Sequence, residues 1–200
     1  MAQAGRVNRY DAGTALIVVD VQNDFTDPDG SLHVPGGEAI VSVINAEIDT
    51  ATAAGARVVY TQDWHPPTTP HFAKDGGVWP VHCVAGTAGA ELYPRLHVVG
   101  PIVRKGISGE DGYSGFSQRD PVSGETVATS LAADLRVVGV GRLVVVGLAQ
   151  DVCVKDTALD GCRLGYDVTV LRAATRPVEL CTGDGARALA ELAAAGVTLE

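Results

Sequence analysis

Short apolar runs that are rich in β-branched side chains recur along the chain and alternate with helical patterns. Runs of this kind are typical of strands that are buried on both faces of a sheet. The best candidates are residues 15–20, 57–63, 144–147 and 167–171. Residues 97–104 form a weaker candidate, because Pro101 cannot donate a hydrogen bond to a neighbouring strand. Residues 197–199 are long enough for one last short strand.

Three stretches between these runs favour helices. In the first of them, Ile40, Val43, Ile44 and Ile48 recur at intervals that place them on one helical face. The predicted helices cover residues 37–54, 151–164 and 183–195, and each is followed by a glycine, at Gly55, Gly165 and Gly196. Glycine at this position commonly ends a helix, because it adopts the left-handed conformation without a steric penalty.

Regular alternation of strands and helices favours a parallel sheet that is covered by helices on both faces. We therefore expect an α/β fold of the Rossmann-like, three-layer kind: a doubly wound, mostly parallel sheet of six strands. The chain contains no repeat, no low-complexity tract and no linker. Residues 1–200 are thus expected to form a single domain, in which residues 1–14 are an N-terminal extension.

The composition is that of an ordinary globular protein and argues against several function classes. Hydrophobic residues make up 46% of the 200 residues and charged residues 20%. A net charge of −9 without any basic run gives no support for nucleic-acid binding. No apolar segment approaches the roughly 20 residues of a membrane helix, and the N-terminus lacks the apolar core of a secretion signal. Four cysteines are too few for a dense disulfide framework, so we expect a cytoplasmic enzyme with free thiols.

Four chemically useful residues lie at or just beyond the ends of predicted strands. Asp20 and Asp63 end two of the runs, Lys105 directly follows the run 97–104, and Cys153 follows the run 144–147 at the start of a predicted helix. Because ligand sites of parallel sheets form beyond the carboxyl ends of the strands, we expect these side chains to share one edge of the sheet.

Cys153 is the candidate nucleophile. A thiol at the start of a helix lies near the positive end of the helix dipole, which favours the reactive thiolate. A buried structural cysteine fits the same stretch equally well, so its neighbours must decide between the two. Asp20 is a candidate base, since a partly desolvated carboxylate has a raised pKa. Lys105 is a candidate point charge, although a lysine in this position is usually a solvated cation at a strand end, so alone it is a weak signal.

The remaining cysteines and a second carboxylate are weaker candidates. Cys162 lies nine residues after Cys153, on the opposite face of a helix, and is expected to belong to the core. Cys181 precedes the last helix, and Cys83, next to a histidine, could be a metal ligand. Asp24 lies further into its loop than Asp20 and is expected to be structural.

One long loop gathers the residues of a candidate metal site. Residues 64–95 are rich in Pro, Gly, Thr and His, and a loop of this length within a compact domain is usually functional. Asp63, His65, His71 and His82 provide one carboxylate and three imidazoles, a ligand set that suits one divalent ion such as Zn, Fe or Mn. The alternative is a set of independent loop histidines. Two aromatic residues near the site, Phe25 and Trp79, could enclose a planar ligand, or could simply pack the loops.

These residues stand in motifs that resemble one known family. The motifs are Asp20-Val-Gln-Asn-Asp-Phe25, Asp63-Trp-His65 with His71, Trp79-Pro-Val-His82-Cys, Lys105-Gly, Tyr113-Ser-Gly-Phe116 and Gly147-Leu-Ala-Gln-Asp-Val-Cys153-Val. Together they are similar to those of the isochorismatase-like cysteine hydrolases, and within them to the nicotinamidase/pyrazinamidase family. The resemblance extends from about residue 15 to the C-terminus.

The resemblance implies a role for each of these residues. Asp20, Lys105 and Cys153 correspond to the catalytic triad of the family, and Asp63, His65, His71 and His82 correspond to its metal ligands. A cis peptide is implied at Leu148–Ala149, where the backbone N–H groups of Ala149 and Cys153 would bind the oxyanion. The implied substrate-binding residues are Phe25, Trp79, Tyr113, Leu148 and Ala149.

The implied reaction is the hydrolysis of nicotinamide to nicotinate and ammonia through a cysteine thioester, with pyrazinamide as a second substrate. The expected partner is therefore a small carboxamide, and neither nucleic acid nor a membrane; the enzyme is expected to be a monomer or a homo-oligomer. The alternatives are an amidase for N-carbamoyl or ureido substrates, an isochorismatase, and a catalytically silent metal- or ligand-binding protein.

Overall fold

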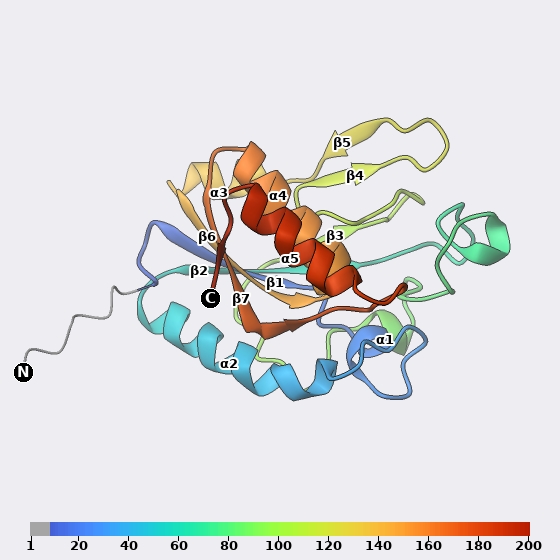
Figure 1. The fold of residues 1–200 in the computed structure, drawn as a ribbon, viewed down its shortest axis with the longest axis horizontal. Coiled ribbons are helices and arrows are strands. Elements are labelled where there is room, and N and C mark those ends of the chain that lie inside the picture. Colours follow the sequence, from blue (N-terminus) through green and yellow to red (C-terminus); the bar gives the residue numbers. More distant parts are fainter. Residues whose placement is uncertain (1–8) are drawn as a thin grey trace, which may run out of the picture.

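The structure, a computed structural model, describes residues 9–200 and consists mainly of one six-stranded sheet (Figure 1). All neighbouring strands in this sheet run parallel, in the order β3-β2-β1-β6-β7-β8. The strands are β1 (Thr14–Val19), β2 (Arg57–Asp63), β3 (Ile102–Lys105), β6 (Arg142–Leu148), β7 (Asp167–Arg176) and β8 (Thr198–Leu199). The prediction of a doubly wound parallel sheet of six strands is confirmed.

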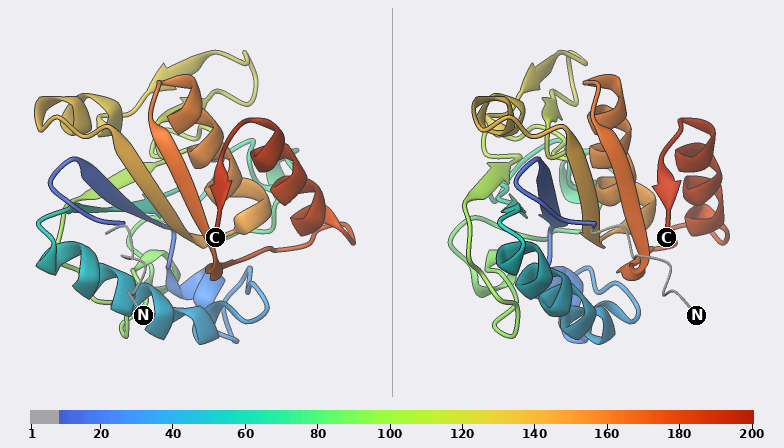
Figure 2. Two further views of the ribbon diagram at one scale, coloured as in Figure 1. Left: turned by 60° about the vertical axis from the view of Figure 1, so that its left-hand side comes forward. Right: turned by 90° about the vertical axis from the view of Figure 1, so that its left-hand side faces the viewer.

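Helices cover both faces of this sheet. The α-helices are α1 (Asn23–Thr26), α2 (Gly37–Ala53), α3 (Leu131–Val137), α4 (Lys155–Arg163) and α5 (Asp184–Ala194). Short 3-10 turns cover Ala73–Asp75 and Ala88–Ala90, and one π-helical turn, η3, covers Gln150–Val154. Helix α2 lies on one face, whereas α3 and α4 lie on the other, with α5 beside the β7–β8 edge (Figure 2).

The core has two layers because the side chains of each strand alternate between the two faces. In β1, Leu16 and Val18 point to the layer under α2, while Ile17 and Val19 point to the layer under α3 and α4. All six residues of β1 are buried. This burial on both sides explains why the central strands read as continuous apolar runs in the sequence.

Several elements differ from the sequence-based expectation. Strand β3 begins only at Ile102, since Pro101 contributes its carbonyl to Tyr60 N–H (3.0 Å) but has no N–H of its own. No strand was predicted between residues 105 and 143, but this region contains β4 (Ser117–Arg119), which forms a hairpin with β5 (Thr126–Ala128). These strands have three residues each and are largely exposed, so they lack the apolar alternation that reveals a strand. Helix α3 was not predicted either.

Part of the expected N-terminal extension packs against the sheet. Tyr10 is buried in the core layer of α2, and Arg9 forms ion pairs with Glu47 on α2 and with the side chain of Glu200. Residues 1–8 of that extension lie outside the described residues. Within residues 9–200, no helix combines the length and the apolar character that crossing a membrane requires.

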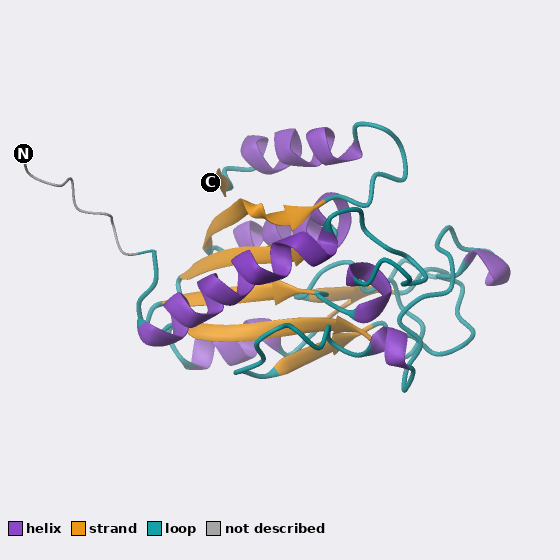
Figure 3. Ribbon diagram, turned by 90° about the horizontal axis from the view of Figure 1, so that it is seen from below, coloured by secondary structure: helices purple, strands orange, loops and turns teal. Residues whose placement is uncertain are grey.

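The carboxyl ends of the strands and the long loops lie on the same side of the molecule (Figure 3). At this edge Asp63 on β2 is directly paired with Lys105 on β3. Strand β6 ends beside β1, where Gly147 has a φ of 115° and any Cβ would lie 2.1 Å from the carbonyl oxygen of Val19. Only glycine fits at position 147. From this close contact with β1 the chain continues into η3, which carries Cys153.

Candidate active site

Cys153 lies in the π-helical turn η3, at the point where strand β6 has ended and helix α4 is about to begin. Its side chain is buried, and its Sγ lies 3.7 Å from Nζ of Lys105. Sγ also lies within 4.8 Å of carboxylate oxygens of Asp20 and Asp63. We refer to Asp20, Lys105 and Cys153 as the nucleophile centre.

Lys105 is fully buried and is surrounded by acceptors. Its Nζ lies 2.7 Å from Oδ2 of Asp20 and 2.5 Å from Oδ1 of Asp63, and it also donates to the carbonyl oxygen of Gly112. Burial opposes its charge, but the two carboxylates outweigh burial and hold the pKa of Lys105 well above its usual value. Two hydrogen bonds to oxygen and the ion pair with Asp20 keep this side chain charged and fixed.

The two carboxylates beside Lys105 differ in proton affinity. Burial raises the pKa of Asp20 to about 6, against the opposing effect of Lys105. Asp63 is equally buried, but Lys105 and the neighbouring histidines overcome its desolvation and lower its pKa. At neutral pH Asp20 is therefore the carboxylate suited to accept and return a proton, while Asp63 remains ionised. Asp20 also accepts a hydrogen bond from Oγ1 of Thr61 (2.6 Å).

Burial, and not the expected helix dipole, has the largest effect on the pKa of the Cys153 thiol. Burial raises the pKa of the Cys153 thiol well above its ordinary value, and the negative charge of Asp20 adds to this effect, although Lys105 opposes it. The resting side chain is therefore a thiol rather than a thiolate. A base has to remove its proton, and Asp20 is the neighbouring base with a suitable pKa.

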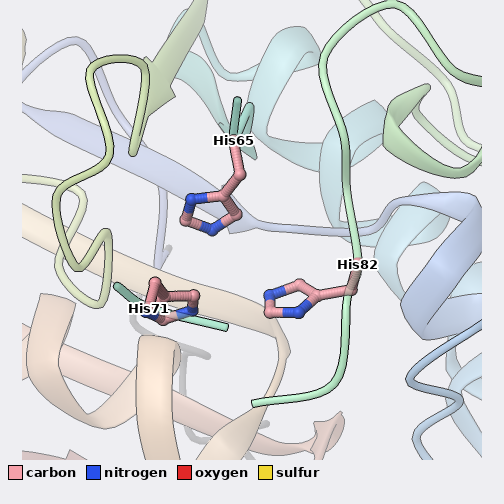
Figure 4. Close-up of side chains that lie close together, drawn as sticks. All are labelled: His65, His71 and His82. Carbon is pink, nitrogen blue, oxygen red and sulfur yellow. The ribbon is translucent and has the colours of Figure 1, made fainter. Parts of the chain in front are cut away.

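Three buried histidines converge next to the nucleophile centre, and we call them the histidine cluster (Figure 4). The rings of His65, His71 and His82 point toward one another, and one nitrogen from each ring lies within 4.8 Å of the others. The second oxygen of Asp63, Oδ2, is 3.8 Å from Nε2 of His65 and 3.9 Å from Nε2 of His82. Asp63 thus lies between the cluster and the nucleophile centre.

Hydrogen bonds fix the orientation of two of these rings. Nδ1 of His71 donates to Oδ1 of Asp111 (2.7 Å), and Nδ1 of His82 donates to the carbonyl oxygen of Pro80 (2.8 Å). Because each acceptor takes the Nδ1 proton, the lone pair of each ring is on Nε2. A set of three imidazoles and one ionised carboxylate fits a divalent transition metal. The donor chemistry of the cluster therefore agrees with the predicted metal site.

Two polar residues near the site, Gln22 and Asp24, form hydrogen bonds with the backbone at the start of the long loop and within it. Gln22 is fully buried; its side chain accepts a hydrogen bond from the N–H of Asp63 (2.8 Å) and donates to the carbonyl oxygen of the same residue (2.8 Å). Asp24 accepts from the N–H of Cys83 (2.7 Å) and so has the structural role expected for it. The Cys83 thiol is buried, and it does not belong to either cluster of possible metal ligands within residues 9–200.

A cavity of about 380 Å³ opens above the nucleophile centre and the histidine cluster. Its lining residues are Phe25, Leu32, Val34, Asp63, His71, Trp79, His82, Gly112, Tyr113, Ala149, Val152, Cys153 and Val178. Trp79 is fixed in the wall by a hydrogen bond from its Nε1 to the hydroxyl of Tyr113 (2.9 Å). The cavity thus combines apolar walls with a polar, reactive floor.

The peptide bond between Leu148 and Ala149 is cis. Ala149 lines the cavity next to Cys153, as expected of a substrate-binding residue. Leu148 does not: it is fully buried in the core layer of α2 and is absent from the cavity lining. Consecutive residues of an extended chain point to opposite sides, which separates these two side chains.

Comparison with known proteins places the chain in a family. The model of the isochorismatase domain matches residues 14–198, which is nearly the whole chain. The chain belongs to the isochorismatase family. The nicotinamidase of Escherichia coli is 39% identical over 203 residues, which cover 92% of this chain and 93% of the relative.

Solved structures of the isochorismatase family agree with this placement. PnC1 from L. infantum, in complex with nicotinate, superimposes with a TM-score of 0.86 at 39% identity and covers 96% of this chain and 94% of its own. The pyrazinamidase of Pyrococcus horikoshii, in complex with zinc, has a TM-score of 0.83 at 39% identity and covers 94% and 98%. The resemblance to nicotinamidases and pyrazinamidases that the motifs indicated is therefore confirmed.

Several residues of this isochorismatase-family site were missed in the sequence. The apolar walls formed by Leu32, Val34, Val152 and Val178 gave no signal, because isolated aliphatic residues in loops are common. Thr61 and Asp111 act through Asp20 and His71, respectively, and lie far from them in sequence. Thr61 had one detectable feature: it is a polar residue within an apolar strand, and it points toward the strand end of β1.

Proposed function

We propose that this protein is a nicotinamidase, which hydrolyses nicotinamide to nicotinate and ammonia and also cleaves pyrazinamide. The observation that carries the proposal is the contact of one thiol, one ammonium and one carboxylate of raised pKa at the floor of a small apolar cavity. The similarity to nicotinamidases and pyrazinamidases supports this choice of substrate. The proposed enzyme uses the whole chain as a single catalytic domain.

Acylation of Cys153 is the first half of the reaction. Asp20 accepts the thiol proton, and the sulfur attacks the carboxamide carbon, so that a C–S bond forms and the carbonyl oxygen becomes an oxyanion. The N–H groups of Ala149 and Cys153 donate to this oxyanion. Asp20 then returns the proton to the amide nitrogen, the C–N bond breaks, and ammonia leaves a thioester behind. Lys105 stabilises the negative charges of this step.

Hydrolysis of the thioester completes the cycle. Asp20, again ionised, removes a proton from water, and the resulting hydroxide attacks the acyl carbon. The C–S bond breaks, the sulfur regains its proton from Asp20, and the carboxylic acid product leaves the cavity. Throughout, Lys105 remains charged, because the two carboxylates beside it and the carbonyl oxygen of Gly112 hold the ammonium form. The same carboxylate thus serves as base and acid in both halves.

The histidine cluster and the aromatic walls would position the substrate. Asp63, His65, His71 and His82 would hold one divalent ion, Zn, Fe or Mn, which when bound supplies an electrophilic contact for the ring nitrogen. Phe25, Trp79 and Tyr113 flank a flat ring and direct its carboxamide toward Cys153. Because the carboxamide would be held next to Cys153 before the reaction begins, this positioning would raise the rate.

An ammonia-release assay tests the proposal. Nicotinamide and pyrazinamide should both be cleaved, whereas N-carbamoyl amines should not, and pre-treatment with a chelator should reduce the rate. The variant Cys153→Ala is the control for contaminating activity. Preferred cleavage of N-carbamoyl or ureido substrates would assign the protein to the alternative amidase class, and absence of ammonia from every substrate would favour a silent binding protein.

We also propose that the protein is located in the reducing cytoplasm. All four of its cysteines are free thiols, which supports this location.

A further inference from the structure

One wall of the cavity is tied directly to the turn that carries the nucleophile. Val178 lines the cavity and belongs to the segment between β7 and α5. Its backbone N–H donates to Oδ1 of Asp151 (2.9 Å), and the next N–H, of Glu179, donates to Oδ2 of the same carboxylate (2.9 Å). Asp151 is buried and precedes Cys153 by only two residues. The two carboxylate oxygens thus each hold one of two successive peptide groups.

The elements that flank this segment, β7 and α5, are also hydrogen-bonded to the turn that carries Cys153. Oε1 of Gln150 accepts from the hydroxyl of Thr175 (3.1 Å), and Nε2 donates to the carbonyl oxygen of Gly185 (3.2 Å). Glu179 has a φ of 52°, and its own carboxylate accepts from the N–H groups of Gly183 and Gly185 at the start of α5. A non-glycine residue adopts this backbone conformation only where its surroundings hold it. The segment is therefore held at several points by polar contacts rather than by regular secondary structure.

We propose that Asp151 is a positioning residue for substrate specificity: it sets the place of the Val178 wall relative to the sulfur of Cys153. The proposal rests on the proposed function, since it takes the cavity as the binding site of the carboxamide. An ionised carboxylate only accepts hydrogen bonds, and charge-assisted bonds are the stronger kind. Asp151 therefore links wall and nucleophile through a short, rigid path.

The variant Asp151→Asn tests this role. The asparagine amide can accept with one atom only and presents its NH₂ group to the second N–H, so one of the two bonds is lost. We expect KM for nicotinamide to rise roughly tenfold, with kcat within about twofold of the original value. Asp156→Asn is the matched control, because Asp156 is on the first turn of α4 and no hydrogen bond joins it to the 177–183 segment among the described residues. A fall in kcat at unchanged KM would overturn the proposal.

A double-mutant cycle separates the wall from a general structural effect. Val178→Ala should raise KM to a similar degree, and the combination with Asp151→Asn should add little, because both changes act on the same wall. Independent effects that multiply in the double variant would contradict the proposal.

Amide hydrogen exchange gives a readout that does not depend on catalysis. In the original protein the N–H groups of Val178 and Glu179 should be protected, and Asp151→Asn should speed their exchange at least tenfold. Fast exchange at both positions in the original protein would overturn the proposal, even if Asp151→Asn did not fold. If nicotinamide were not hydrolysed at all, the proposed function would fail on its own, while this measurement would still test the link between Asp151 and the wall.

Discussion

The nucleophile centre and the histidine cluster are adjacent, but their positions have different physical origins. Asp20, Lys105 and Cys153 follow strands β1, β3 and β6, and the register of the parallel sheet sets their spacing. The histidines of the cluster lie in irregular backbone after β2. Their positions depend on individual hydrogen bonds, which His71 donates to Asp111 and His82 donates to the Pro80 carbonyl.

This difference predicts that the two regions respond differently to substitution. Both faces of the sheet are packed, so the backbone at the sheet edge is held firmly. Replacement of a reacting side chain there should abolish the reaction while the neighbouring residues keep their positions. The three residues of the histidine cluster and Asp63 are proposed to bind one metal ion together, so loss of one histidine should weaken metal binding without removing the nucleophile. Asp63 belongs to both regions, since its two oxygens face Lys105 and the histidines, respectively. Four substitutions test the separation.

The largest effect is expected for Cys153→Ala. Removal of the sulfur eliminates the covalent step, and losses of about 10⁶-fold in kcat are known when a catalytic nucleophile is removed. We expect loss of all measurable ammonia release, with circular dichroism and metal content unchanged. Turnover close to the original rate would contradict the assignment of the nucleophile, and loss of metal would contradict the independence of the two regions.

A smaller effect is expected for His71→Ala. One of four ligands is lost, so we expect metal content after dialysis, measured by elemental analysis, to fall strongly and nicotinamide hydrolysis to fall about 100-fold. The thiol should keep its environment, so peptide mapping after alkylation should show Cys153 reacting at the original rate. His97→Ala is the matched control, because His97 is exposed and, among residues 9–200, its ring is hydrogen-bonded only to Asp49. Unchanged metal content in His71→Ala would remove His71 from the ligand set.

The same contrast decides how much of the site could be predicted from the sequence. Residues of the nucleophile centre were found because a polar residue directly after a buried apolar run is conspicuous, and because parallel strands end on one side of a sheet. The histidines were found from their residue type and their common loop. Their neighbours were not: Asp111 reaches His71 across 40 positions, and only the folded loop brings the two together.

The fold was predictable for a related reason. Central strands such as β1 and β6 are buried on both faces and so carry a strong apolar signal. The β4–β5 hairpin is exposed and three residues long per strand, and its pairing depends on contacts that no local pattern encodes. The protonation of Cys153 was also beyond the sequence, because the desolvation that raises its pKa depends on complete burial in the folded chain.

A third substitution, Asp111→Ala, should weaken the cluster without removing a ligand. The carboxylate of Asp111 holds the Nδ1 proton of His71, and loss of such a partner typically costs 10–100-fold in metal affinity. We expect Asp111→Ala to lower the metal affinity by close to 100-fold. Asp111→Asn retains a neutral acceptor and should lower the affinity by less. Competition with a chromogenic chelator measures the affinity. Glu110→Ala is the control, since among residues 9–200 that carboxylate accepts only from Ser108 N–H. An equal loss of affinity in the control would refute the role of Asp111.

The smallest effect, on the pH profile, is expected for Thr61→Val. The hydroxyl of Thr61 donates to Oδ1 of Asp20 and favours the ionised carboxylate, which lowers the pKa of Asp20. Because Asp20 must be ionised to accept the thiol proton, kcat/KM should decrease as the pH falls through about 6. Removal of the donor raises the pKa of Asp20, so the midpoint of this acid limb should move upward by about one pH unit.

Activity of Thr61→Val above the shifted midpoint should stay within about twofold of the original, because the base is ionised in both proteins there. Thr26→Val is the matched control: it removes a fully buried hydroxyl that has no hydrogen-bond partner among residues 9–200. That control should keep the original midpoint. A uniform loss of activity at every pH in Thr61→Val would mean that the hydroxyl supports packing of the sheet edge rather than the proton affinity of Asp20. An unchanged profile would mean that a base other than Asp20 controls the acid limb.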